Sequence, residues 1–126
     1  MRLNVINPNT TRSMTDTIAA AARRIAAADT HLMATQPAHG PVSIESHFDE
    51  AISAVGVLEE VAAGDREGAD AHVIACFGDP GLLAAREVTR APVIGIAEAA
   101  FHMASLISTR FSVVTTLGRT GIIAEH

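Results

Sequence analysis

Residues 71–81 read AHVIACFGDPG, an apolar run that stops at the only cysteine of the chain and is followed at once by a Gly/Pro turn. The run 71–75 predicts a buried strand, and the turn at 78–81 predicts where that strand ends. The strand therefore delivers the thiol of Cys76 to its own carboxyl end. Because ligands of open parallel sheets bind outside the carboxyl ends of the strands, this position indicates a functional site.

Two interpretations of Cys76 are open at this point. An unoxidised cysteine is among the most buried residue types, and in the first interpretation Cys76 is a small apolar side chain of the core. Alternatively, a helix over 82–90 begins near Pro80 and places its amino end beside the thiol. Such a helix end lowers a thiol pKa from about 8.5 toward neutrality, and the thiolate is the form that acts as a base or nucleophile. We expect the second environment.

Strand and helix patterns alternate on both sides of this segment. Apolar runs bounded by turn residues predict strands at 3–6, 31–35, 71–75, 91–96 and 111–116. Helical spacing of apolar residues predicts helices over 13–25, from 43 or 46 to 64, over 82–90 and over 98–107. Strands joined by helices of this length form a parallel sheet, so we expect an α/β, three-layer fold with four to five strands flanked by helices.

The spacing also predicts which helix faces pack on the sheet. In the first helix the predicted apolar face holds Met14, Ile18, Ala21, Ala22 and Ile25. In the second helix it holds Ile44, Phe48, Ala51, Ile52, Val55, Leu58, Val61 and Ala62.

The carboxyl ends of parallel strands share one edge of the sheet. We therefore expect the loop 7–11, the turn 76–79, Gly95 and residues 115–116 to converge there. The loop reads NPNTT and contains no glycine, which argues against a dinucleotide-binding fingerprint and leaves amide and hydroxyl groups for a small polar ligand.

Composition excludes several classes of function. The 126 residues are one domain by length, and the single cysteine excludes an internal disulfide. A net charge of −5 with 3% aromatic residues indicates no nucleic-acid partner. No apolar run approaches the ~20 residues that span a bilayer, and no signal peptide is recognisable, so we expect a cytoplasmic protein without membrane contact.

Other cysteine chemistries lack their partner residues. A phosphatase-type loop needs Arg where Leu82 stands, and a zinc site needs a second sulfur or histidine close to Cys76, so we expect no metal. His72 would lie roughly 13 Å from the thiol along a strand, too far for a hydrogen-bonded pair. A hydrolase would have to draw its histidine from the loop that contains His39.

Five blocks, taken together and in order, closely resemble the aspartate/glutamate/hydantoin racemase family, and within it the hydantoin and allantoin racemases. They are VINPNTT (5–11), GPVSIE (40–45), CFGDPG (76–81), PVIGIAEA (92–99) and VVTT (113–116). The resemblance implies a cofactor-independent isomerase with two similar α/β lobes. Each lobe supplies one cysteine, and the two thiols move the α-proton of a small-molecule substrate such as a hydantoin, allantoin or an amino-acid derivative.

The resemblance also implies roles for individual residues. Cys76 matches the cysteine of the first lobe, and the residues that would bind substrate are Asn7, Asn9, Thr10, Phe77, Gly78, Thr115 and Thr116. Loop closure and helix capping are the alternative roles of Asn9 and Thr10. Thr115 and Thr116 are alternatively ordinary strand residues.

Family members are nearly twice as long as this chain. The resemblance therefore implies that residues 1–110 form the first lobe and that 111–126 begin a truncated second lobe. Two functions follow as alternatives. The chain is either one lobe of a racemase or a non-catalytic module for ligand binding or assembly, and decarboxylases and isomerases of the same superfamily are a variant of the first. Removal of a lobe would expose a sheet flank, so we expect a homo-oligomer.

Overall fold

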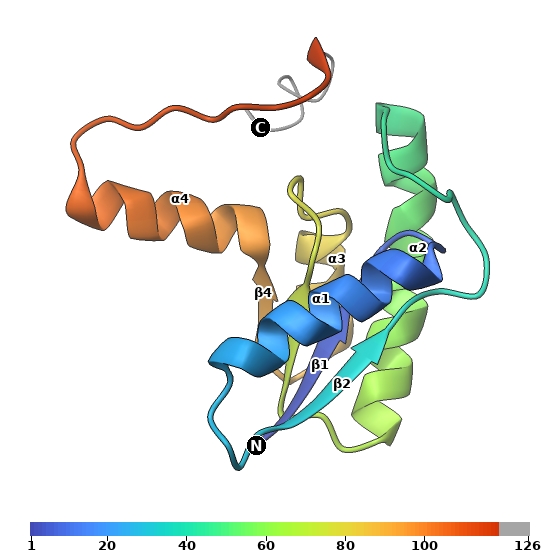
Figure 1. Ribbon diagram of the computed structural model, residues 1–126. Helices are drawn as coiled ribbons and strands as arrows, with labels where there is room; N and C mark the ends of the chain where they lie inside the picture. The colour runs from blue at the N-terminus through green and yellow to red at the C-terminus, as the bar shows by residue number, and fades with distance from the viewer. Residues whose placement is uncertain (119–126) are drawn as a thin grey trace.

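The computed structural model describes residues 1–118 as alternating strands and helices (Figure 1). The elements are β1 (Arg2–Ile6), α1 (Arg12–Ile25), β2 (His31–Thr35), α2 (His47–Arg66), β3 (Ala71–Ile74), α3 (Leu82–Val88), β4 (Val93–Gly95) and α4 (Ile96–Ile107). The predicted α/β class is confirmed, with four strands.

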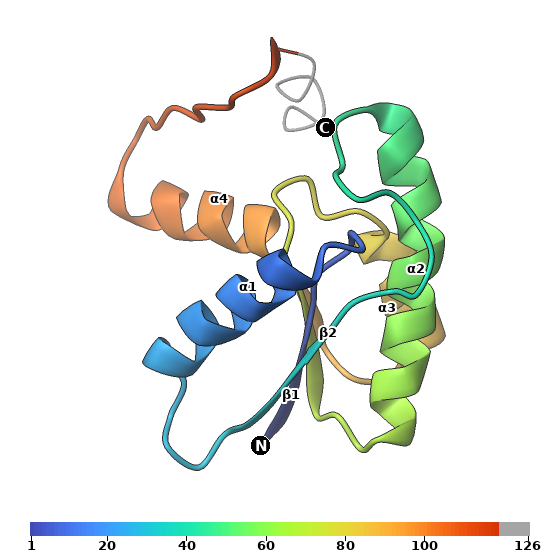
Figure 2. The ribbon, with the colours of Figure 1, turned by 45° about the vertical axis from the view of Figure 1, so that its right-hand side comes forward.

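The four strands form one parallel sheet in the order β2-β1-β3-β4. Ile6 of β1 is in register with Thr35 of β2 and with Ile74 of β3, and Ile74 is in register with Gly95 of β4. The carboxyl ends of all four strands therefore lie along one edge. Figure 2 shows α1 on one side of the sheet and α2 with α3 on the other, so the sheet is the middle of three layers.

The apolar core lies between the sheet and the α2–α3 layer. It consists of the buried side chains Ile6, Val57, Val61, Ile74, Leu82, Ala85 and Val93. Burying each of the larger ones contributes roughly 1.5–3 kcal/mol, so this layer holds the carboxyl edge of the sheet in place.

The predicted faces of the first two helices are wrong in part. Met14 and Ile25 of α1 are exposed, whereas Thr15 and Ala19 are buried. On α2 the exposed side chains include Phe48, Ile52 and Val55, and the buried positions are Ser53, Gly56, Val57, Val61 and Gly64. Small residues face the sheet because they let the helix axis approach it closely.

Polar side chains fill the space where α2 crosses β1 and β3. The amide nitrogen of Asn4 donates to Nδ1 of His72 at 3.1 Å and to the carbonyl of Glu60 at 3.2 Å. Nε2 of His72 donates to Asp65 Oδ1 at 2.8 Å. Asn4 and His72 are fully buried, so His72 is a structural residue and not a partner of Cys76.

The fifth predicted strand, 111–116, is not a strand in the described part of the chain. The segment after α4 turns back and runs above that helix toward the carboxyl edge of the sheet (Figure 1). A strand exists only where a neighbour supplies ladder hydrogen bonds, and this segment has no neighbour in the sheet. Residues 119–126, the rest of the expected start of a second lobe, lie outside the described residues.

Candidate active site

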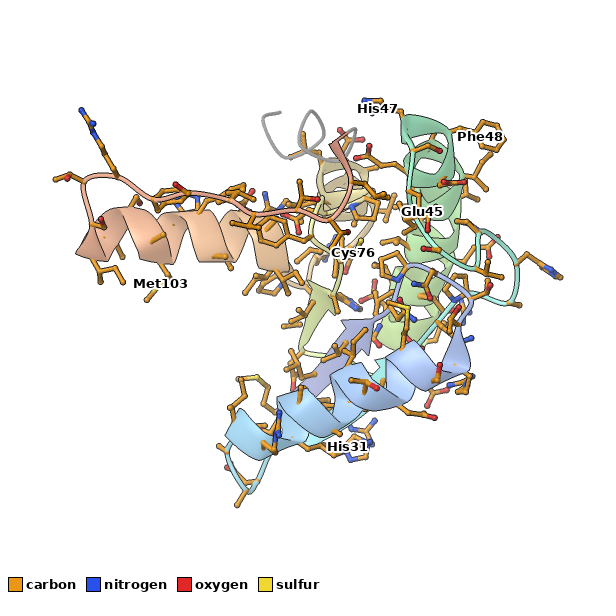
Figure 3. The ribbon with its side chains drawn as sticks, turned by 45° about the horizontal axis from the view of Figure 1, so that its top comes forward. His31, Glu45, His47, Phe48, Cys76 and Met103 are labelled. Atoms are coloured by element: carbon orange, nitrogen blue, oxygen red, sulfur yellow. The ribbon has the colours of Figure 1, made fainter. Side chains whose placement is uncertain are left out.

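The loops after β1 and β3 lie side by side at the carboxyl edge of the sheet. The N–H of Ala75 donates to the carbonyl of Ile6 at 2.8 Å, which extends the pairing of these strands by one residue. Asn7 and Cys76 are the next residues of their chains. Figure 3 shows Cys76 beyond the end of β3, between the segment that follows α4 and the start of α2.

Residues 76–79 form a tight turn with glycine where the backbone requires it. The N–H of Asp79 donates to the carbonyl of Cys76 at 3.0 Å, which closes the turn. Gly78 has a φ of 150° and Asp79 a φ of 50°, both in the region that L side chains rarely adopt. The side chain of Cys76 is partly buried at this turn.

The electrostatic environment of Cys76 is opposite to the one predicted. Burial, together with the negative charges of Asp79 and Glu50, raises the pKa of the thiol from its ordinary value of 9.0 to about 11. Helix α3 begins only at Leu82 and is seven residues long, so its amino end lies six residues beyond the cysteine. Burial and the two carboxylates therefore outweigh the helix dipole, and the thiol is protonated at neutral pH.

A cavity of about 510 Å³ opens between the 76–79 turn and the start of α4. Its lining includes Glu50, Gly78, Asp79, Glu98 and Phe101. A salt bridge from Arg86 to Glu98, at 2.7 Å, lowers the pKa of Glu98, and this carboxylate is ionised at neutral pH. The cavity is thus bordered by acidic groups and by the backbone of the cysteine turn.

Phe77 lines two further cavities, of about 330 and 360 Å³. It packs edge-on against Phe101 at 5.4 Å between ring centroids, and Phe101 stacks on Phe111 at 5.8 Å. The larger of the two is lined by Ser43, Ile44, Glu45, Phe77, Val113, Val114, Thr115, Thr116 and Leu117. Thr115 and Thr116 therefore line the same cavity as Phe77 of the cysteine turn, although they do not lie on a strand. Cys76 itself lines none of the three cavities.

The asparagines of the first loop use their side chains within the loop. Asn7 donates to Asn9 Oδ1 at 2.8 Å and to Thr15 Oγ1 at 3.0 Å, and it accepts from the N–H of Asn9. Asn9 accepts from the N–H of Thr11 at 2.9 Å. Both asparagines are buried, with 2% and 5% of their surface exposed, so they close the loop.

Thr10 joins the first loop to the segment before α2. Its N–H donates to the carbonyl of Pro41 at 3.0 Å, and its own carbonyl accepts from the side chain of Gln36 at 2.8 Å. Thr11 stands at the N-cap position of α1, but its side chain makes no capping hydrogen bond.

Two residues that shape the site were not among the predicted site residues. Asp79 lies in a Gly-Asp-Pro-Gly sequence, which indicates a turn. That sequence does not indicate that the carboxylate of Asp79 contacts α4. Phe101 lies in α4, and only its pairing with Phe77 places it at the site. Within residues 1–118, no group of three His, Cys, Asp or Glu side chains could hold a metal ion. No helix in the same part of the chain is long and apolar enough to cross a membrane.

Comparison with known proteins supports a common origin for this arrangement. A family described as Asp/Glu/Hydantoin racemase matches residues 3–126. A hydantoin racemase of Pseudomonas sp. (strain NS671) is 54% identical over 125 residues, which are 99% of this chain and 50% of that protein. A hydantoin racemase of Rhizobium meliloti is 51% identical, over 99% of this chain and 52% of that protein.

Solved structures of racemases also match this chain. The allantoin racemase from Klebsiella pneumoniae superposes with a TM-score of 0.97 at 64% identity, covering 100% of this chain and 51% of that one. The allantoin racemase from Pseudomonas fluorescens gives 0.94 at 38% identity, covering 99% and 53%. The chain spans about half the length of each of these proteins.

Proposed function

Because this chain belongs to the Asp/Glu/hydantoin racemase family, we propose that it acts in the cofactor-independent racemisation of a hydantoin-type substrate, allantoin included, with Cys76 as one acid/base group. The observation that carries the proposal is the place of Cys76. It lies at the carboxyl edge of the sheet, in a turn whose next three residues line cavities. A hydantoin racemase matches this chain in sequence, and an allantoin racemase matches it in structure.

The chemistry needs a base, an acid and a stabilised enolate. The hydrogen at the stereocentre of a hydantoin is next to a carbonyl, so its removal places negative charge on the carbonyl oxygen. Backbone N–H groups aimed at that oxygen stabilise the charge, and in our proposal those of Phe77 and Gly78 do so. Thr115 and Thr116 contact the ring, while Asn7, Asn9 and Thr10 act by holding the neighbouring loop.

Cys76 removes the substrate proton through its thiolate, which is the minor form of the side chain near neutral pH. With a pKa of about 11 its resting form is the thiol, and only a small fraction is the thiolate that removes a proton. The second proton transfer comes from another group, since the chain has one cysteine. A planar enolate that reaches water is reprotonated on either face, so even one acid/base group leads to loss of configuration.

The test is polarimetry of an enantiopure hydantoin or allantoin with the native chain and with Cys76→Ser. We expect the native chain to accelerate the decay of optical rotation and the variant to lose at least about a hundredfold of that acceleration, the order of effect of an acid/base group. Equal rates would rule out Cys76.

His39→Asn is the matched control, because His39 is the residue that a thiol hydrolase would need. It lies in the exposed loop before α2, and we expect this variant to racemise the substrate at the native rate. Binding of substrate by calorimetry, without decay of rotation in any variant, would instead establish the non-catalytic module.

We also propose the setting in which the chain works. A single thiol stays reduced in the cytoplasm, which is the compartment we assign. We propose that the chain self-associates through the apolar side chains that the fold leaves exposed.

A further inference from the structure

The carboxylate of Asp79 joins the cysteine turn to the start of α4. Its Oδ1 accepts the N–H of Ala97 at 2.9 Å, and its Oδ2 accepts the N–H of Glu98 at 2.7 Å. The N-cap residue of α4 is Gly95, which has no side chain to satisfy these groups. Asp79 therefore caps a helix from a loop that precedes it by 17 residues or more in the sequence.

The backbone of Asp79 is held on both sides. Its N–H donates to the carbonyl of Cys76 at 3.0 Å, and its carbonyl accepts the N–H of Leu82 at 3.1 Å. A φ of 50° is uncommon for a residue other than glycine, and such a conformation persists only where the surrounding structure fixes it. The bonds to α4 and within the turn are what fix it here.

Gly95 leaves the space that the carboxylate occupies. A Cβ atom at this position would overlap the carboxylate atoms of Asp79. The carboxylate of Asp79 thus fills the space where a side chain at position 95 would lie, and we expect a side chain one methylene longer than aspartate to disturb this packing.

We propose that Asp79 is a positioning residue, which fixes the 76–79 turn on the start of α4 and so holds the Cys76 thiol and the backbone of Phe77 and Gly78 in one geometry. The inference rests on the proposed function, in which Cys76 moves the proton. Each oxygen of Asp79 already accepts an N–H of α4, so the residue acts through the turn and not on the substrate.

The experiment measures Cys76 and α4 separately. The rate at which iodoacetamide alkylates Cys76, the only thiol, is followed by mass spectrometry between pH 7 and pH 10. Amide hydrogen exchange of Ala97 and Glu98 is followed by NMR. The variants are Asp79→Glu, which keeps the charge but lengthens the side chain, and Asp79→Asn, which keeps the size but removes the charge.

The positioning role predicts that both variants change both measurements. We expect the amides of Ala97 and Glu98 to exchange at least about tenfold faster. We expect the rate of alkylation to change at least about threefold in Asp79→Glu although the charge is preserved. In Asp79→Asn it rises further, about tenfold, because a negative charge near the thiol is also removed.

Two control variants separate charge from geometry. Glu50→Gln removes the other carboxylate that acts on the thiol and makes no bond to the turn, so it should speed alkylation without changing exchange at Ala97 or Glu98. Asp29→Asn makes the same chemical change as Asp79→Asn at an exposed site after α1, and it should change neither measurement.

The proposal is overturned if Asp79→Glu matches the native chain in both measurements. Fast alkylation in Asp79→Asn alone would mean that Asp79 acts only by its charge, which also overturns it. Should Asp79→Glu fail to fold by circular dichroism, Gly95→Ala displaces the same carboxylate with Asp79 intact and must give the same two changes. Because neither measurement requires turnover, failure here is distinct from failure of the racemase proposal.

Discussion

Cys76 shows how a residue's position and its chemistry are set by different parts of the chain. An apolar run followed by Gly-Asp-Pro-Gly is enough to place a thiol at the end of a strand, and that prediction is confirmed by the structure. The predicted fall of its pKa is wrong, because burial by other elements and the carboxylates of Asp79 and of Glu50, which belongs to α2, raise the pKa instead. The local sequence contains Asp79, but it shows neither the extent of burial nor the nearby Glu50.

The raised pKa of Cys76 makes the stability of the fold depend on pH. An unfolded cysteine ionises near pH 9 and the folded one near pH 11, so between these values the unfolded state loses a proton that the folded state keeps. Stability contributed by this group is complete below pH 9 and is lost as the pH rises toward 11.

We expect the free energy of unfolding to fall by about 1.4 kcal/mol more for the native chain than for Cys76→Ser between pH 8 and pH 10. Urea denaturation at the two pH values measures this difference. Parallel pH profiles of the two proteins would mean that the folded thiol ionises at its ordinary value.

At the scale of elements, the order of strands and helices can be predicted from apolar periodicity. The face of each helix that is buried cannot. The spacing that assigned Phe48, Ile52 and Val55 to the buried face of α2 correctly finds a helix. The same spacing does not show that small residues determine which side of α2 packs closest to its neighbours. Gly56 and Gly64, which weaken a helix in isolation, are where α2 contacts the loop before it and the sheet.

Gly64→Ala tests this account of α2. A Cβ at this position would overlap the amide of Asn4 and lie 2.9 Å from Cε1 of His72, and both side chains are buried and hydrogen-bonded. Overpacking should outweigh the roughly 1 kcal/mol that alanine gains over glycine in a helix, for a net loss of about 1–3 kcal/mol in unfolding free energy.

The matched control is Ala62→Gly, at an exposed position of the same helix, which should cost only the propensity difference of about 1 kcal/mol. Both values come from chemical denaturation. A Gly64→Ala protein as stable as the native chain would show that α2 is not packed as described.

At the scale of the whole molecule, α4 leaves most of its large apolar side chains exposed. It runs away from the sheet after its first turn, with 61% of Met103, 77% of Leu106 and 84% of Ile107 exposed (Figure 1; Met103 is labelled in Figure 3). The sequence predicted this helix but not its exposure, because exposure depends on what packs on it. The chain spans about half the length of its racemase relatives.

Apolar surface of this kind is expected to be covered by self-association. We predict that the 13.1 kDa chain sediments as an oligomer in analytical ultracentrifugation, and that Leu106→Glu with Ile107→Glu shifts it toward the monomer. Arg23→Glu, on the exposed side of α1, is the charge-changing control and should not. A native chain that sediments as a monomer throughout would refute self-association.

The most direct test of the account is exchange of the substrate's α-proton for deuterium, measured by NMR in D₂O with the native chain and Cys76→Ser. If the sulfur of Cys76 moves that proton, the difference between the two rates should rise about tenfold per pH unit from pH 7 to pH 10. This follows because the thiolate fraction grows in that proportion below a pKa of about 11. Equal exchange rates at every pH would contradict the account.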